Sequence, residues 1–127
     1  MEHRYPLTVR FNECDMYGHV NHATYLSYLE HARVDWLEQA GMPLSQLTAS
    51  GYYLYIVKIT IEYKRPALFS DRLEVVSSTS KKSRIGGIFH QRVTREGEVV
   101  ADAQVHWVCV DRDEKPTRLP EAISRGL

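Results

Sequence analysis

The order of hydrophobic patterns along this chain predicts an α+β fold, with one long helix packed against a five-stranded antiparallel sheet. Apolar residues recur at helical spacing in only one long stretch, from Asn21 to Gly41. The other patterned stretches alternate apolar and polar residues, which is typical of strands with one buried face, and short turns separate most of them. Short turns favour antiparallel pairing, so we expect a meander-like sheet with the helix against it.

The N-terminal stretch predicts a strand, a loop and the start of the helix. Alternation over residues 7–11 indicates a half-buried first strand, and residues 12–20 form a loop. Asn21 is a good candidate for the helix N-cap, because its short side chain can accept a hydrogen bond from a free backbone amide. The amides of residues 22–24 would then lie unpaired at the helix start and face the loop.

A broad apolar arc runs along the predicted helix. Its members are Tyr25, Leu26, Tyr28, Leu29, Ala32, Trp36 and Leu37. An arc of this width indicates a helix wrapped by other structure rather than laid on a surface. Arg33 falls inside the arc and needs a partner, for which Glu30 one turn earlier is the candidate. Gly41 and Pro43 supply the glycine stop and the proline that end the helix.

Four further strands are predicted in the second half of the chain. They cover residues 53–64, 73–80, 85–95 and 99–109. A connector over residues 45–51 precedes them, and Pro66 ends the first because proline has no amide to donate. The pair Gly86-Gly87 indicates a bulge or a close backbone approach, and a short helix can follow Pro120.

This architecture leaves apolar surface uncovered. One helix covers little of a five-stranded sheet, and several of the predicted strands are rich in aromatic residues. A monomer would therefore expose a larger apolar patch than soluble monomers usually tolerate, so the pattern predicts a homo-oligomer.

Length and composition are those of an ordinary globular protein, so we expect residues 1–127 to form a single domain. Sixteen basic residues balance sixteen acidic ones, which gives no global attraction to nucleic acid or to an anionic membrane. No apolar run approaches the roughly 18–20 residues that span a bilayer, and the N-terminus holds no apolar signal region. Two cysteines, Cys14 and Cys109, are too few for a disulfide scaffold, which favours a reducing cytoplasm.

Asp15 is a single carboxylate placed just ahead of the predicted helix start. Unpaired amides at a helix start carry partial positive charge. A carboxylate that faces such amides suits hydrolysis of a carbonyl compound, because one group activates water or attacks and the other stabilises the oxyanion. An ordinary solvated loop aspartate is the competing interpretation of the same residue.

Two other chemistries compete for the same loop. Asp15, His19 and His22 could hold a metal, but their spacing is not a strong metal signature and a fourth ligand is not indicated, so we expect no metal. Cys14 beside two histidines could be a thiol nucleophile, although a cysteine here is more simply a small buried hydrophobe.

Three motifs give the chain a resemblance to a known family. The first is D-x-Y-G-H-V-N-x-x-x-Y from Asp15, followed by E-x-A-R from Glu30, and the others lie at residues 63–73 and 99–103. Together they resemble the 4-hydroxybenzoyl-CoA thioesterase family of hot-dog folds, most closely its acyl-CoA thioesterase branch. The resemblance implies a hot-dog fold, in which the sheet wraps one long central helix, and assembly into homodimers or homotetramers.

The resemblance also implies an activity, the hydrolysis of an acyl-CoA thioester to a free acid and CoA without a cofactor. Asp15 aligns with the family's catalytic carboxylate, as general base or nucleophile, and the backbone amide of His22 would polarise the thioester carbonyl. Gly18, Asn21 and Tyr25 belong to the same motif and are expected to bind substrate, with Tyr25 lining the acyl pocket or simply packing in the core. The apolar, tyrosine-rich strand and helix favour a fatty acyl chain.

CoA carries phosphates, so an acyl-CoA enzyme needs local basic residues. Lys81, Lys82 and Arg84 form the only dense basic cluster, although such a run is usually a solvated turn. Related thioesterases use basic residues near this strand junction. Lys64 and Arg65 are weaker candidates for the same role.

Two other functions are compatible with these residues. A hot-dog hydratase or dehydratase would act on the same thioesters, but it usually needs a histidine paired with a carboxylate in the pocket, and no such pair is evident. A non-catalytic acyl-binding module would keep the pocket without the chemistry. Glu30 is an alternative carboxylate, since other hot-dog lineages place a glutamate on the central helix.

Overall fold

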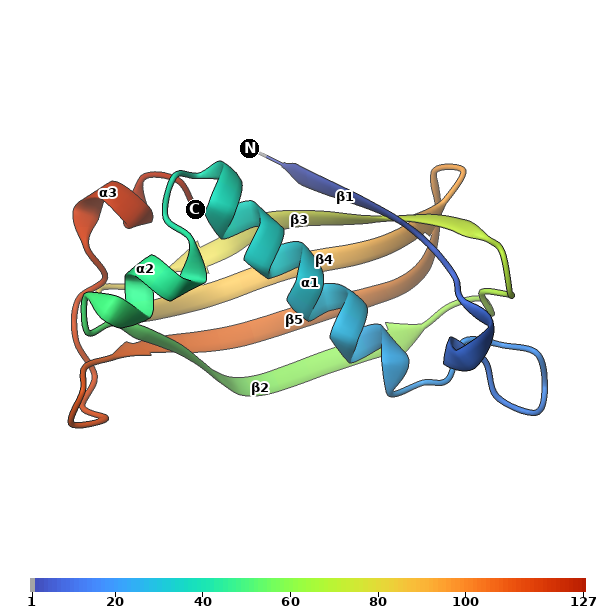
Figure 1. Cartoon of the computed structure of the whole chain (residues 1–127), viewed down its shortest axis with the longest axis horizontal. Coiled ribbons are helices and arrows are strands. Elements are labelled where there is room, and N and C mark those ends of the chain that lie inside the picture. Colours follow the sequence, from blue (N-terminus) through green and yellow to red (C-terminus); the bar gives the residue numbers. More distant parts are fainter. Residues whose placement is uncertain (1) are drawn as a thin grey trace.

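In a computed structural model that describes residues 2–127, a five-stranded antiparallel sheet curls around one long helix (Figure 1). The strands are β1 (His3–Thr8), β2 (Tyr53–Tyr63), β3 (Arg72–Lys82), β4 (Gly86–Arg95) and β5 (Glu98–Val110). The helices are α1 (Thr24–Gln39), α2 (Leu44–Ala49) and α3 (Glu121–Ser124), and a 3-10 turn covers Phe11–Glu13. The predicted α+β architecture of one long helix and five antiparallel strands is confirmed.

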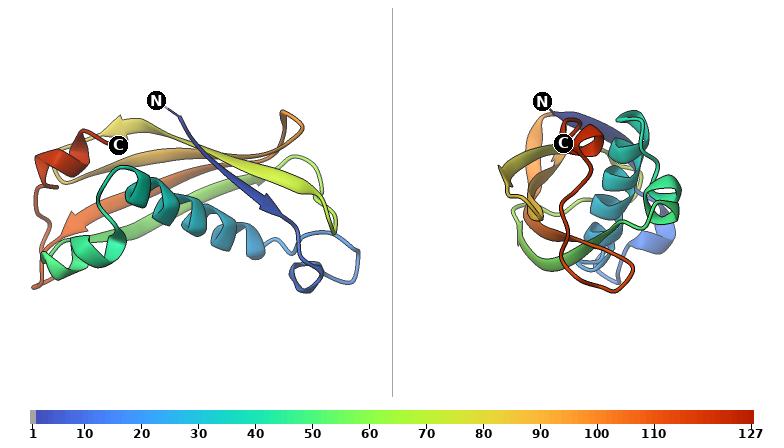
Figure 2. Two further views of the ribbon diagram at one scale, coloured as in Figure 1. Left: turned by 45° about the horizontal axis from the view of Figure 1, so that its top comes forward. Right: turned by 90° about the vertical axis from the view of Figure 1, so that its left-hand side faces the viewer.

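The strand order is β1-β3-β4-β5-β2, so the two strands that flank α1 in sequence occupy opposite edges of the sheet. β3, β4 and β5 form the expected meander, but β2 pairs with β5 and not with β3. The prediction of a simple meander is therefore wrong for β2. With β1 and β2 at opposite edges, the inner strands form a continuous concave face, and α1 lies across it (Figure 2).

The apolar arc of α1 packs into this concave face. Its buried members are Tyr25, Tyr28, Leu29, Ala32, Trp36 and Leu37. Inner-facing residues of the sheet, such as Val75, Phe89 and Val105, complete the core, and the rings of Trp36 and Phe89 lie 5.2 Å apart. Leu26, which the sequence predicts in this arc, is 41% exposed, because the sheet wraps only one side of the helix.

Arg33 finds a neutral partner inside the fold. Its guanidinium donates to Oε1 of Gln91 at 2.9 Å, and the Gln91 amide donates in turn to the Leu29 carbonyl at 3.1 Å and to Ser77 Oγ at 3.0 Å. Burial lowers the pKa of Arg33, and the nearby Glu30 carboxylate opposes that shift. Glu30 and Arg33 form no ion pair within residues 2–127, so the predicted partner is wrong, because β4 brings Gln91 to the guanidinium instead.

Two boundaries differ from the sequence-based expectation. β1 begins at His3, ahead of the predicted 7–11 strand, because the chain pairs along β3 from there and then turns at Phe11–Glu13. The predicted connector over 45–51 folds largely as α2, a short helix that covers one end of the β2 strand.

Two further local expectations are confirmed. Gly86 makes a close backbone approach, since a Cβ atom there would lie 2.3 Å from the Trp107 carbonyl oxygen. The short helix α3 begins directly after Pro120. No helix within residues 2–127 is long and apolar enough to cross a membrane.

We expect Leu29→Ala to lower the free energy of unfolding by about 2–5 kcal/mol, because Leu29 is fully buried and its loss leaves a cavity under α1. Leu26→Ala, on the same helix, should change it by about 0.5 kcal/mol, since Leu26 is 41% exposed. Urea unfolding followed by circular dichroism measures both values. Equal losses would contradict a sheet that encloses only one side of α1.

Candidate active site

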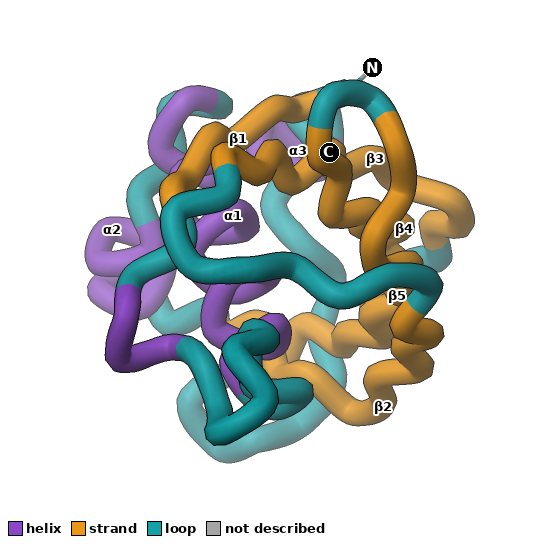
Figure 3. The backbone as a smooth tube through the Cα atoms, turned by 90° about the vertical axis from the view of Figure 1, so that its right-hand side faces the viewer, coloured by secondary structure: helices purple, strands orange, loops and turns teal. Residues whose placement is uncertain are grey.

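Two loops meet at the end of the sheet where α1 begins (Figure 3). The first, residues 9–23, connects β1 to α1, and the second, residues 64–71, connects β2 to β3. Backbone groups join them, because the Val20 amide donates to the Ala67 carbonyl at 2.8 Å and an antiparallel bridge follows beside it. The helix start is thereby fixed against the end of the β2 strand.

The two loops border an open recess. It is lined by Asp15, His19, Val20, His22, Tyr25, Tyr63, Lys64, Arg65 and Pro66. The structure therefore brings together three residues that the sequence predicts as site residues, Asp15, His22 and Tyr25. Gly18 and Asn21 lie in the same loop but outside this lining, where they shape the backbone.

Asp15 is half-buried and is held by its own loop. Its Oδ1 accepts hydrogen bonds from the amides of Tyr17 at 2.9 Å and His19 at 3.4 Å. Gly18 completes the turn with a φ of 77°, a backbone conformation that favours glycine. Within residues 2–127, Oδ2 accepts no hydrogen bond, so one carboxylate oxygen is available to a water molecule or a substrate.

The start of α1 leaves one amide of this loop unpaired. α1 begins at Thr24, so the prediction of Asn21 as its N-cap is wrong. Asn21 instead closes a preceding turn: its Oδ1 accepts from the Ala23 amide and its carbonyl accepts from the Thr24 amide, each at 2.9 Å. In the described part of the chain, the His22 amide donates to no protein acceptor. N–H and C=O of a trans peptide point in opposite directions, so the His22 N–H points away from α1.

Tyr25 is both a core residue and a wall of the recess. It is only 3% exposed, and its ring packs edge-on against those of Tyr28 at 5.9 Å and Tyr63 at 5.3 Å. Burial raises the pKa of Tyr25, and a hydrogen bond with the Ala67 backbone opposes that shift. Core packing and recess lining, the two alternatives for this residue, therefore both apply.

Lys64 and Arg65 are the lysine and arginine that line the recess together with Asp15. Both line the recess, and each forms an exposed ion pair, with Glu62 at 3.0 Å and with Glu98 at 2.7 Å respectively. Exposed pairs of this kind are weak and exchange easily with another anion. The residues that the sequence ranks lower for phosphate binding are thus the ones close to the candidate carboxylate.

The predicted basic cluster, Lys81, Lys82 and Arg84, lies at the opposite end of the sheet from the recess. β3 has 11 residues and separates them from the recess by roughly 35 Å, at about 3.3 Å per residue. Lys82 Nζ donates to the Ser124 carbonyl and so anchors α3. Arg84 lines a second open recess together with Arg118. Within one chain, the basic cluster and the candidate carboxylate are not brought together.

An ion pair fixes the second loop. Asp71 accepts from Arg95 at 2.6 Å and from the Leu68 amide at 2.8 Å, and Arg95 also donates to the Pro66 carbonyl at 3.1 Å. Burial alone would raise the pKa of Asp71, but the Leu68 amide and the Arg95 guanidinium together lower it below its ordinary value. Asp71 lies within the family motif at residues 63–73, but no local pattern predicts its ion pair, because its partner is 24 residues away.

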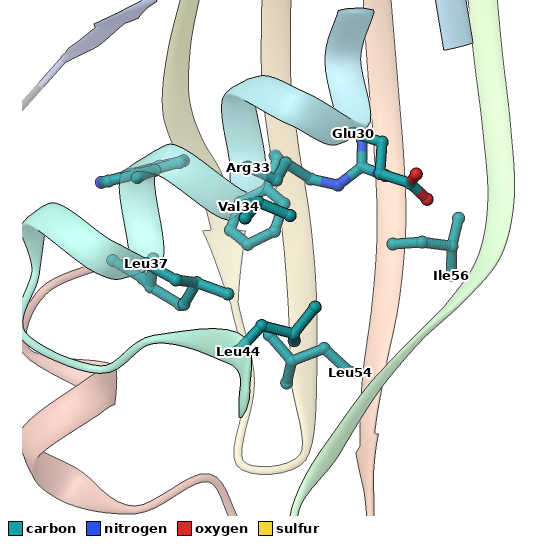
Figure 4. Close-up of a pocket in the computed structure, with 10 residues that line it drawn as sticks. Glu30, Arg33, Val34, Leu37, Leu44, Leu54 and Ile56 are labelled. Atoms are coloured by element: carbon teal, nitrogen blue, oxygen red, sulfur yellow. The ribbon is translucent and has the colours of Figure 1, made fainter. Parts of the chain in front are cut away.

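A second, apolar pocket opens between α1, α2 and β2 (Figure 4). Its apolar wall includes Val34, Leu37, Leu44, Leu54 and Ile56. Glu30 and Arg33 border it on α1, and Leu44 and Ile56 are each 39% exposed. Exposed apolar side chains around a concavity mark a site for an apolar ligand or for another protein surface. Phe89 of β4 and Leu127 also line it, so its walls come from elements far apart in the sequence, which is why sequence patterns do not reveal it.

The other candidate groups of the first loop do not converge on a second chemistry. Among residues 2–127, no three His, Cys, Asp or Glu side chains lie close enough to hold a metal ion. Cys14 is absent from the recess lining and packs partly buried against the core, which favours its interpretation as a small hydrophobe. Cys14 and Cys109 are unpaired.

A long helix packed into the concave face of a five-stranded antiparallel sheet defines a hot-dog fold. A solved structure of a hypothetical protein from Aquifex aeolicus superposes with a TM-score of 0.93, at 30% identity and over 98% of each chain. The chain belongs to the thioesterase-like superfamily, which matches residues 9–127.

Two relatives have names that describe an activity. The long-chain acyl-CoA thioesterase FadM of Escherichia coli K12 is 41% identical over 107 residues, which cover 83% of this chain and 80% of that protein. The acyl-CoA thioester hydrolase YbgC of Escherichia coli O6:H1 is 32% identical over 122 residues, which cover 94% of this chain and 91% of that protein. The suspected family resemblance and the hot-dog fold are therefore confirmed.

We expect Asp71→Asn to lower the free energy of unfolding at neutral pH, and the deficit to shrink in acid. A folded-state pKa below the unfolded value stabilises the fold above about pH 4, the ordinary pKa of aspartate, and this stabilisation disappears as the pH falls through the folded-state pKa. Urea unfolding at pH 7 and near pH 2 measures the deficit. Asp113→Asn, at an exposed position, is the control that should show none. A deficit independent of pH would exclude the charge of Asp71 as its cause.

Proposed function

We propose that this protein is an acyl-CoA thioesterase that hydrolyses a fatty acyl-CoA to a free fatty acid and CoA without a cofactor. The observation that carries the proposal is that one recess is lined both by Asp15, which has a free carboxylate oxygen, and by His22, whose backbone amide is unpaired within residues 2–127. Membership of the thioesterase-like superfamily supports it, as does the 41% identity to a relative named a long-chain acyl-CoA thioesterase.

The reaction needs a base or nucleophile and a group that stabilises negative charge on the thioester oxygen. Asp15 Oδ2 either takes a proton from a water molecule that attacks the carbonyl carbon, or attacks that carbon itself to form a mixed anhydride that water then cleaves. The His22 N–H donates to the oxyanion in either route. The carbon–sulfur bond breaks, and CoA leaves as a thiolate that takes up a proton.

A second copy of this chain completes the site in our proposal. In the described part of the chain β2 is an edge strand with one side of its backbone unpaired, and it exposes Ile56 and Val57 at 39% and 62%. Two copies that pair edge to edge through β2 about a two-fold axis would bury these side chains. Strands related in this way run antiparallel, so the Tyr53 end of one β2 would lie beside the Tyr63 end of the other.

This pairing would bring the predicted basic cluster to the substrate. Lys81 and Arg84 lie at the Tyr53 end of the sheet, because the starts of β2 and β4 both pair with the end of β5. In the proposed pair, β2 and β5 of one chain lie between the basic residues and the other chain's β2, next to the Asp15 recess. The separation would be about three strand spacings, or roughly 15 Å. That reach suits the phosphates of CoA, which lie far from the thioester. The apolar pocket lies at the same end and would take the fatty acyl chain.

The cellular setting follows from the same proposal. Unpaired cysteines fit a reducing compartment, so we propose the cytoplasm. Hydrolysis of a fatty acyl-CoA belongs to lipid metabolism. We also propose that the whole chain is one thioesterase domain, since a single sheet order includes strands from both its N-terminal and C-terminal parts.

Asp15→Asn should lower kcat for thiol release from a fatty acyl-CoA by on the order of 10²–10⁴-fold, because an amide neither takes the proton nor attacks the carbonyl. The loop should persist, since the Asn side-chain oxygen can still accept from the Tyr17 amide. A thiol-reactive dye follows the reaction, and Cys14→Ala is the neighbouring control that should keep most activity. Near-normal hydrolysis by Asp15→Asn would overturn the proposed role.

The parent protein itself discriminates between the function classes. Thiol release from an acyl-CoA indicates a thioesterase. Consumption of an unsaturated acyl-CoA without thiol release would indicate a hydratase, and binding without consumption would indicate an acyl-binding module.

The assembly has its own test, a mixture of two defective variants. Reversing Lys81 and Arg84 to Glu should raise KM for acyl-CoA by about three- to tenfold, through lost contacts with phosphates, and should spare a thioester that lacks the nucleotide. In a mixed dimer, one chain carries the Lys81 and Arg84 reversals and the other carries Asp15→Asn. If the basic cluster of each chain serves the active site of the other, the intact Asp15 of the first chain meets the intact cluster of the second, which gives one intact site. If each cluster served its own chain, neither site would be intact. We expect such purified mixed dimers to show a low-KM activity that neither variant shows alone. Absence of that activity would place the phosphates elsewhere, with Lys64 and Arg65 the next candidates.

A further inference from the structure

Two adjacent peptide groups determine where the His22 amide points. The first joins Asn21 to His22, and its carbonyl accepts from the Thr24 amide at 2.9 Å. The second joins His22 to Ala23. Because each peptide group is planar, the backbone at His22 can move only by rotation of one plane against the other. The two planes share the His22 Cα atom, so a contact that holds the second plane limits the rotations by which the first plane, with the His22 N–H, could turn.

The second peptide group is held at both of its polar atoms. The Ala23 N–H donates to Asn21 Oδ1 at 2.9 Å, and the His22 carbonyl accepts from the hydroxyl of Tyr63 at 2.7 Å. The Asn21 bond is local to the loop and moves with it. The Tyr63 bond ties the loop to the sheet, across 41 residues of sequence.

Tyr63 is a rigid point of attachment for this loop. It is the last residue of β2, and it pairs with Ala101 of β5 in the sheet. Its ring packs edge-on against the buried Tyr25 ring at 5.3 Å, which fixes the direction of the hydroxyl. Tyr63 also lines the recess beside Asp15, yet 47% of its surface is exposed, so its hydroxyl contributes little to the core.

We infer that Tyr63 is a positioning residue of the thioesterase reaction, which holds the His22 amide in the orientation that stabilises the oxyanion. The inference rests on the proposed function. The hydroxyl proton of Tyr63 is committed to the His22 carbonyl, so Tyr63 acts through the backbone and not on the substrate. Because the oxyanion forms on the way to the transition state, loss of this bond lowers turnover and leaves substrate binding unchanged.

The test is Tyr63→Phe, which keeps the ring and removes only the hydroxyl. We expect kcat to fall by about tenfold, since a small displacement of an oxyanion donor is costly, and KM to stay within about twofold. Tyr55→Phe is the matched control on the same strand. Among residues 2–127, the Tyr55 hydroxyl donates only to Glu114, at 3.3 Å, and its removal should leave both constants unchanged. A kcat equal to that of the parent overturns the inference, and so does a rise in KM at constant kcat.

Two further readouts separate positioning from other roles. The pH profile of kcat should keep its shape in Tyr63→Phe, whereas a lost limb would mean that Tyr63 itself transfers a proton. In combination with Asp15→Asn, the two fold-losses should multiply, because the residues act on different groups. A double variant no slower than Asp15→Asn alone would show that Tyr63 acts through the carboxylate.

Hydrogen exchange at the backbone tests the role of Tyr63 without depending on thioesterase activity. Hydrogen exchange at the Ala23 amide should be faster in Tyr63→Phe by about tenfold, with an unchanged thermal midpoint, because one of the two restraints on that peptide is gone. Unchanged exchange overturns the inference even if the parent is an active thioesterase. If the parent releases no thiol from any acyl-CoA, the proposed function fails, and the role of Tyr63 in that reaction fails with it.

Discussion

The packing of α1 into the concave face of the sheet is the constraint on which the rest of the structure depends. Leu29 and Ala32 are fully buried at its centre, and a helix held at close-packed density cannot slide or rotate without opening cavities. The first turn of α1 is therefore fixed at one end of the sheet. Both loops of the recess end at elements that this packing holds in place, so the position of the recess follows from the core.

The candidate site on this helix is built mainly from backbone. Its proposed oxyanion donor is the N–H of His22, and backbone groups close the loop around it, from the Asn21 carbonyl to the Ala67 carbonyl. Side chains act chiefly by holding these peptide groups, as Tyr63 does at the His22 carbonyl and as Arg95 does at the Pro66 carbonyl. A backbone donor held before the substrate arrives needs no reorganisation during the reaction, which is the physical basis of oxyanion stabilisation.

The two ends of the sheet in one protomer carry different chemical groups. One end carries Asp15 and the unpaired amide, and the other carries the apolar pocket and the basic residues Lys81 and Arg84. β2 links the two ends along an edge of the sheet that pairs with no other strand of residues 2–127. A thioester substrate has a reacting centre, an apolar tail and a phosphate-bearing end. A two-fold pair through β2 would supply all three in one place, which gives the proposed dimer a functional reason beyond the burial of apolar surface.

Sequence by itself determined what is local. The helix and most of the strands follow from apolar spacing. Asp15, His22 and Tyr25 line one recess because they are close in sequence and share one loop-to-helix junction. Tertiary structure decided every contact across a long stretch of sequence: Arg33 with Gln91 over 58 residues, Tyr63 with His22 over 41 residues, and Asp71 with Arg95 over 24 residues. It also decided that β2 lies at an edge of the sheet. The reason is that periodicity records which face of an element is buried but not which strand lies next to it, and strand order alone selects these partners.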